Sequence, residues 1–122
     1  MAEMKRILVA EDEKPLAQAV TAKLENEGFE VTVAHNGAEA IEALKKESFD
    51  LAILDLVMPD MDGFEVLESL QKDGNKTPAV VVSNLAQGVD QEKAEKYGIK
   101  KYFIKSNTSL SEIVVEIKKI LT

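Results

Sequence analysis

Five residues with side chains suited to metal or phosphoryl chemistry each follow a short apolar run. Glu11 and Asp12 follow "ILVA", Asp55 follows "LAIL", Ser83 follows "AVVV", and Lys105 ends "KYFIK". An ionised group at the end of a buried strand persists only when it is paired, hydrogen-bonded or bound to a metal. The carboxylate of Asp55 is therefore expected to have such a partner.

The charges of these residues indicate which partner that is. Three carboxylates brought close together repel one another, and Lys105 offsets only one of the three charges. A divalent cation would offset two more, and an all-oxygen ligand set that leaves room for water suits Mg²⁺ better than Ca²⁺. A metal beside a carboxylate, a hydroxyl and an ammonium supplies the groups needed to make and stabilise an acyl phosphate.

The elements that must position these residues alternate along the chain. Short β-like runs are predicted at Ile7–Ala10, Glu30–Ala34, Asp50–Leu54, Ala79–Val82 and Lys101–Ile104. Three of these runs are continuously apolar at their centres, as expected for parallel strands that are covered on both faces.

Segments with helical spacing follow each of these runs. Apolar positions mark the first three helices, a polar fourth is predicted from about Gln87 to Tyr97, and Ser109 with Glu112 forms a capping box before the last. Pro15 fits a first helical turn, Gly28 a helix end and Asp62 an N-cap, while Pro59 and Asp60 are expected to shape a turn.

Five βα units predict the fold class: α/β, a flavodoxin-like (βα)5 three-layer sandwich with a five-stranded parallel sheet of order 2-1-3-4-5. In such a sheet the first, third, fourth and fifth strands are neighbours. Their carboxyl ends, and the five residues above, are expected to meet in one shallow pocket.

Length and composition agree with one domain spanning 1–122. The chain has 122 residues, a net charge of −7, no cysteine and one histidine, so neither a thiolate nor a multi-histidine metal site is available. Its acidic balance disfavours direct nucleic-acid binding. Without a long apolar stretch, no membrane association is expected and cytoplasmic residence is the default.

The chain resembles the receiver domain of two-component response regulators over its whole length, and is similar to the single-domain chemotaxis-type regulators. The resemblance rests on Glu11-Asp12, on "DLVMPDMDG" at 55–63, on Ser83 and on "YFIK" at 102–105. It implies that Asp55 accepts a phosphoryl group from a sensor histidine kinase or a phosphotransfer protein. It also implies a protein that catalyses only its own phosphorylation and dephosphorylation and is otherwise not an enzyme.

The resemblance further implies a role for each matching position. Asp12 and Asp55 would bind Mg²⁺, with Glu11 acting mainly through water and the backbone carbonyl of Val57 completing the protein ligands. Ser83 and Lys105 would contact the phosphoryl oxygens. Tyr102 would be the aromatic switch residue whose rotamer follows that of Ser83.

An output surface is implied as well, formed by the fourth helix, the fifth strand and the fifth helix at roughly 87–121. It would control an unknown output protein or domain, and the chain would be a monomer or a phosphorylation-dependent dimer.

Two positions depart from the family pattern. Ser106 stands where the family usually has proline after its lysine, often through a cis peptide bond; the loop is therefore either strained or trans and differently shaped. Asn84 replaces a commonly small residue, and we hypothesise that it restricts access to Asp55 and changes the lifetime of the phosphorylated state.

Three other functions make different demands on the sequence. A haloacid-dehalogenase-type phosphatase needs a second acid two residues after the first, where this chain has Val57. A flavin carrier needs a hydroxyl- and glycine-rich loop after its first strand, where this chain has "AEDEKP". The third alternative is a pseudo-receiver that docks partners with little or no phosphorylation, which Ser106 and Asn84 leave open.

Overall fold

The computed structural model describes residues 4–58, 62–84 and 88–121. Its strands are β1 (Arg6–Ala10), β2 (Glu30–Ala34), β3 (Leu51–Leu54), β4 (Ala79–Ser83) and β5 (Lys101–Ile104). Its helices are α1 (Lys14–Asn26), α2 (Gly37–Lys46), α3 (Gly63–Lys72), α4 (Gly88–Glu95) and α5 (Leu110–Leu121), with a 3₁₀ turn, η1 (Lys105–Asn107), after β5.

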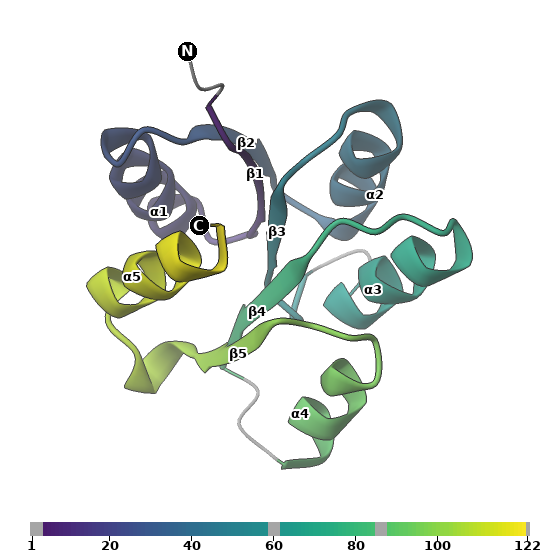
Figure 1. The fold of residues 1–122 in the computed structure, drawn as a ribbon. Coiled ribbons are helices and arrows are strands. Elements are labelled where there is room, and N and C mark those ends of the chain that lie inside the picture. The colour runs from purple at the N-terminus through teal and green to yellow at the C-terminus, as the bar shows by residue number, and fades with distance from the viewer. Residues whose placement is uncertain (1–3, 59–61, 85–87, 122) are drawn as a thin grey trace.

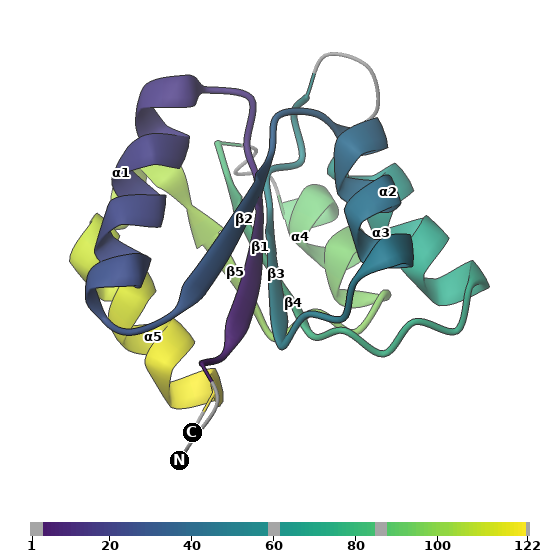
Figure 2. The ribbon, with the colours of Figure 1, turned by 90° about the horizontal axis from the view of Figure 1, so that it is seen from above.

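All five strands lie in one parallel sheet, in the predicted order β2-β1-β3-β4-β5. Helices α1 and α5 cover one face of the sheet, and α2, α3 and α4 cover the other (Figures 1 and 2). The predicted flavodoxin-like three-layer architecture is therefore confirmed.

The core consists of two layers because neighbouring strand residues point to opposite faces of a sheet. Ile7 and Val9 pack with α1 and α5, whereas Leu8 and Ala10 pack with α2 and α3; all four are buried. Strands that are apolar on both faces can only lie in the middle of such a sandwich. This burial fixes which residues reach the carboxyl end of each strand.

Most predicted boundaries match to within a residue or two, and the differences have local causes. Asp50 lies before β3 rather than in it, because its carboxylate accepts a hydrogen bond from the backbone N–H of Arg6 (2.8 Å). Ser83 extends β4 by one residue through its pairing with Ile104.

Several predicted helix signals are confirmed. The side chain of Asp62 accepts from the backbone N–H of Glu65 at 2.9 Å and caps α3, and the Ser109 hydroxyl accepts from the N–H of Glu112 at 3.1 Å. Gly28 follows α1 with a φ of 95°, a conformation that favours glycine. Pro59, Asp60 and the predicted helix start at Gln87 lie outside the described residues.

Candidate functional site

The site lies at the carboxyl edge of the sheet, where the strand ends fix the backbone of its acidic residues. The N–H of Glu11 donates to the carbonyl of Ala34 at 2.9 Å, and the N–H of Asp55 donates to that of Ala10 at 3.0 Å. Each bond continues the parallel ladder by one residue beyond the strand. The backbone positions that carry the two carboxylates are thus fixed by the sheet itself.

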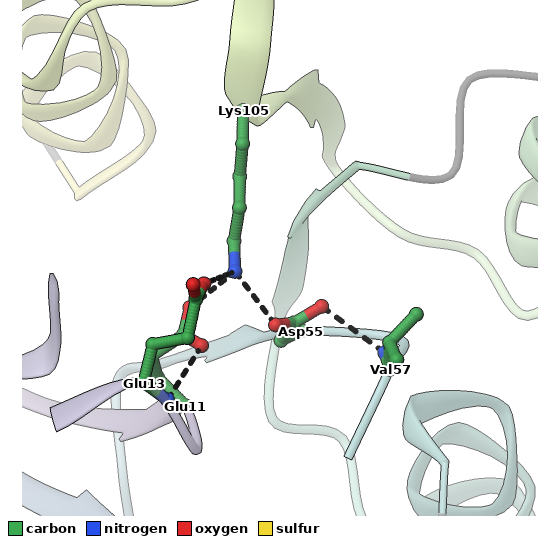
Figure 3. A network of polar contacts seen from close by, with 5 residues as sticks. All are labelled: Glu11, Glu13, Asp55, Val57 and Lys105. Atoms are coloured by element: carbon green, nitrogen blue, oxygen red, sulfur yellow. Dashed lines mark hydrogen bonds and ion pairs between the residues drawn. The ribbon is translucent and has the colours of Figure 1, made fainter.

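Lys105 joins these residues into one network. Its Nζ lies 2.7 Å from Asp55 Oδ2, 2.8 Å from Glu11 Oε1 and 2.9 Å from Glu13 Oε2 (Figure 3). The lysine side chain is only 11% exposed, and those of Asp55 and Glu11 are 5% and 6% exposed. Asp55 therefore has the ionic partner that its position at the end of a buried strand requires.

The remaining acceptor of Asp55 is also used. Its Oδ1 accepts from the backbone N–H of Val57 at 3.1 Å, so the carboxylate is held from both sides (Figure 3). Val57 itself is 55% exposed. Asp55 and Val57 line an open hollow of about 290 Å³ together with Asp12, Glu13, Asn84 and Lys105. Asp55 thus borders this hollow although its side chain is almost fully buried.

The electrostatics follow from crowding charges in a poorly hydrated place. Burial raises the pKa of Glu11 to about 7, a hydrogen bond from Lys105 opposes that rise, and the charge of Asp55 adds to it. Burial alone would lower the pKa of Lys105, but its hydrogen bonds to Asp55, Glu11 and Glu13 outweigh burial and raise it above the usual range. Lys105 is therefore a permanent cation, while Glu11 exchanges its proton near neutral pH.

Three of the acids could hold a metal ion. Glu11, Asp12 and Asp55 each offer a carboxylate oxygen, and these oxygens lie within 4.8 Å of one another. A cluster of carboxylate oxygens at a water-accessible edge fits a hard divalent cation such as Mg²⁺. The residues present therefore fit the metal that the sequence predicts.

Ser83 and Tyr102 are not among the residues that line this hollow. Ser83 is the last residue of β4 and is fully buried. Tyr102 on β5 is half-buried and packs against the same cluster as Val81, which puts it on the sheet face that α2, α3 and α4 cover. Burial raises the pKa of the Tyr102 hydroxyl, and the charges of Asp90 and Asp55 raise it further. The roles of Ser83 and Tyr102 stay predictions.

The loop after Lys105 takes the trans form. The described residues contain no cis peptide bond, and Lys105–Asn107 form the 3₁₀ turn η1 with Ser106 exposed. Even so, Lys105 reaches Asp55. Proline is thus not needed at Ser106 to position the lysine.

One residue of the network was not singled out by the sequence. Glu13 lies at the start of α1, beyond the strand-end residues, and it contributes the third carboxylate on Lys105. The only signal for it was its place in the acidic run "EDE" directly after β1.

Comparison with known protein families identifies the family to which this chain belongs. Residues 7–118 match the family model described as the response regulator receiver domain. The chain belongs to this family. As a receiver domain, it is a component of two-component signalling, and its edge of acidic residues is the place where receiver domains in general bind Mg²⁺.

Individual relatives agree with that assignment. The receiver domain is 35% identical over 113 residues, 93% of its length, to the regulatory protein VanRc of Enterococcus gallinarum, and covers 48% of that protein. It is 35% identical over 100 residues, 82% of its length, to the cell cycle response regulator CtrA of Brucella ovis, of which it covers 43%. The chain thus spans less than half the length of these two curated relatives.

Solved structures show the same fold. The receiver domain of the Francisella response regulator 1452 superposes with a TM-score of 0.90 at 30% identity, covering 96% of both chains. A CheY-like receiver domain protein from Methanospirillum hungatei gives a TM-score of 0.91 at 28% identity, covering 98% of this chain and 94% of that one. None of the helices described for this receiver domain is long and apolar enough to cross a membrane.

Proposed function

We propose that this receiver domain accepts a phosphoryl group on Asp55, in a Mg²⁺-dependent reaction, from a histidine kinase or phosphotransfer protein in the cytoplasm. The observation that carries the proposal is the 2.7 Å contact between Lys105 Nζ and Asp55 Oδ2 beside the acidic cluster of Glu11, Asp12 and Asp55. A cation and a candidate metal site flanking one carboxylate that borders a hollow are what phosphoryl transfer requires.

The chemistry assigns a task to each group. A carboxylate oxygen of Asp55 attacks phosphorus as the bond from phosphorus to the donor's imidazole nitrogen breaks, and that nitrogen keeps the electron pair. The product is an acyl phosphate, which water later hydrolyses back to the carboxylate. The Lys105 ammonium and the Ser83 hydroxyl would contact the phosphoryl oxygens. The protein would thus catalyse only its own modification and its reversal.

The metal would be held by Asp12 and Asp55, by Glu11 mainly through water, and by the backbone carbonyl of Val57. When bound, Mg²⁺ would neutralise negative charge on the phosphoryl oxygens.

The surface formed by α4, β5 and α5 is the proposed output region. Ala94 is the single buried residue of α4 (Gly88–Glu95), and Lys93 Nζ lies 4.2 Å from the centre of the Phe64 ring. Val89 on α4 and Val115 on α5 are 65% and 51% exposed. A helix with so little burial can shift at small cost. Phosphorylation would change this surface and so control an output protein or domain. The receiver domain would act either as a monomer or as a phosphorylation-dependent dimer.

Beryllofluoride, which mimics a phosphoryl group on a carboxylate, tests the assignment of Asp55. With Mg²⁺ present, we expect it to shift NMR signals around Asp55, Ser83 and Tyr102 and to leave Asp55→Asn unaffected. An identical response in Asp55→Asn, or no response in the wild type, would leave only the pseudo-receiver docking module.

Magnesium affinity tests the acidic cluster and has a defined pH dependence. Glu11 has a pKa of about 7 in the folded protein against an ordinary value of 4.5, so its proton stabilises the metal-free fold at low pH, and that contribution is lost as pH rises from about 4.5 to about 7. Mg²⁺ must displace this proton. Its affinity is expected to fall about tenfold or more between pH 8 and pH 5.5, as measured by calorimetry or NMR titration.

Two variants complete that experiment. Asp12→Ala should weaken Mg²⁺ binding severely at both pH values. Asp62→Asn removes a carboxylate charge outside this cluster but retains a good N-cap, so it should bind Mg²⁺ as the wild type does. Equal affinities in Asp12→Ala and the wild type would contradict the proposed metal site.

A further inference from the structure

The ammonium of Lys105 is saturated with carboxylates. A lysine ammonium has three N–H donors, and Lys105 has three carboxylate partners, Asp55, Glu11 and Glu13, at 2.7, 2.8 and 2.9 Å (Figure 3). A phosphoryl group on Asp55 would add oxygens that also need this cation. Lys105 must then give up at least one of its present partners.

The three partners differ in how tightly they are held. The side chains of Asp55 and Glu11 are 5% and 6% exposed, whereas that of Glu13 is 59% exposed. A buried carboxylate that loses its cation is left poorly solvated, but an exposed one is rehydrated at once. Glu13 is therefore the partner that Lys105 can release at the smallest cost.

The backbone of Glu13 is fixed although its side chain can move. Its carbonyl accepts from the N–H of Ala17 at 2.9 Å, and its own N–H donates to Glu11 Oε2 at 3.2 Å. It occupies the N-cap position of α1, but its side chain makes no capping hydrogen bond. The Glu13 carboxylate can thus leave Lys105 without disturbing the helix.

We propose that Glu13 is a positioning residue that, in the unmodified protein, occupies the Lys105 donor which a phosphoryl group on Asp55 takes over. This inference rests on the proposed function. Glu13 competes with the phosphoryl oxygens for Lys105 and so disfavours the modified state. The release of Glu13 to solvent accompanies modification.

Two substitutions separate the contact from the charge. Glu13→Gln removes the negative charge, whereas Glu13→Asp keeps the charge but is one methylene shorter and loses its reach to Lys105. Glu25→Gln is the matched control, because Glu25 is an exposed glutamate on the same helix. Beryllofluoride affinity is measured by NMR at saturating Mg²⁺ for each variant, together with the ¹⁵Nζ signal of Lys105.

We expect both Glu13 variants to bind beryllofluoride about two- to fivefold more tightly than the wild type, the range that an exposed ion pair typically provides. The Lys105 signal should shift in both, and Glu25→Gln should match the wild type. Tighter binding in Glu13→Gln with wild-type binding in Glu13→Asp would show a general charge effect and overturn the proposal. Unchanged or weaker binding in both would overturn it too. Should the wild type itself fail to bind beryllofluoride, the proposed function fails rather than the role of Glu13 alone.

Discussion

Gly63→Ala is expected to lower the free energy of unfolding by about 3 kcal/mol, at the upper end of the usual cost of overpacking. A Cβ on Gly63 would lie 2.5 Å from the carbonyl oxygen of Asp55 and 2.9 Å from Leu56 Cα. Both are backbone atoms, so no side-chain rotation relieves the clash. The N–H of Gly63 also donates to the Leu56 carbonyl at 3.1 Å, which holds the two segments together.

Because this clash moves the backbone of Asp55 itself, Gly63→Ala should also weaken beryllofluoride binding. Stability is measured by urea unfolding and binding by NMR. Gly88→Ala is the control: nothing lies within 4 Å of a Cβ at the first residue of α4, so its stability should change by less than about 0.5 kcal/mol. Equal stability of the two alanine variants would contradict the close approach at Gly63.

Lys105→Met is expected to cost about 3 kcal/mol at pH 8 and much less at pH 5. The substitution keeps an apolar stem but leaves Asp55 and Glu11 buried without their cation, and breaking a buried pair in this way costs roughly 3–5 kcal/mol. The loss raises the pKa of Glu11 above its already elevated value of about 7. Protonation then relieves the repulsion as pH falls, so the variant recovers stability on the acidic side.

Lys118→Met provides the matched control for this pH profile. Lys118 pairs with Glu27 at 2.7 Å on the surface, and the hydrogen bond and charge of Lys118 lower the pKa of Glu27 below 4.5. That pair contributes stability above pH 4.5 and loses it only in more acidic solution. The cost of Lys118→Met should thus be small and flat between pH 5 and 8. Mg²⁺ should stabilise Lys105→Met more than it stabilises the wild type, because the metal cation replaces the lost positive charge. Thermal unfolding measures both the pH profile and the stabilisation by Mg²⁺. A flat profile for Lys105→Met would contradict the buried network.

The parallel sheet and the residues at its strand ends could be predicted because buried parallel strands have a distinctive apolar pattern. The order of the strands was predicted from the rule for right-handed crossover connections. Ile7–Ala10 and Leu51–Leu54 are apolar throughout, and such runs must lie in a covered sheet. Once the order was fixed, the positions of Glu11, Asp12, Asp55 and Lys105 were fixed with it.

What the sequence could not provide is the direction of side chains beyond the strand ends. Glu13 lies at the start of α1, far from Lys105 in the sequence. The two residues meet only because the Lys105 side chain extends to the Glu13 carboxylate. Ser83 is the last residue of β4 and is fully buried, a depth that its place after an apolar run could not reveal. The shape of the loop at Ser106 depends on its backbone torsions. A serine in place of the usual proline does not determine those torsions, so the sequence could not predict the shape.

The most direct test of phosphorylation at Asp55 is to locate the phosphoryl group itself. The protein is incubated with Mg²⁺ and acetyl phosphate, its intact mass is measured, and the modified residue is identified by fragmentation. We predict one phosphoryl group per chain, on Asp55, which is absent without Mg²⁺ and absent in Asp55→Asn. No added phosphoryl group, or one that persists in Asp55→Asn, would contradict the account.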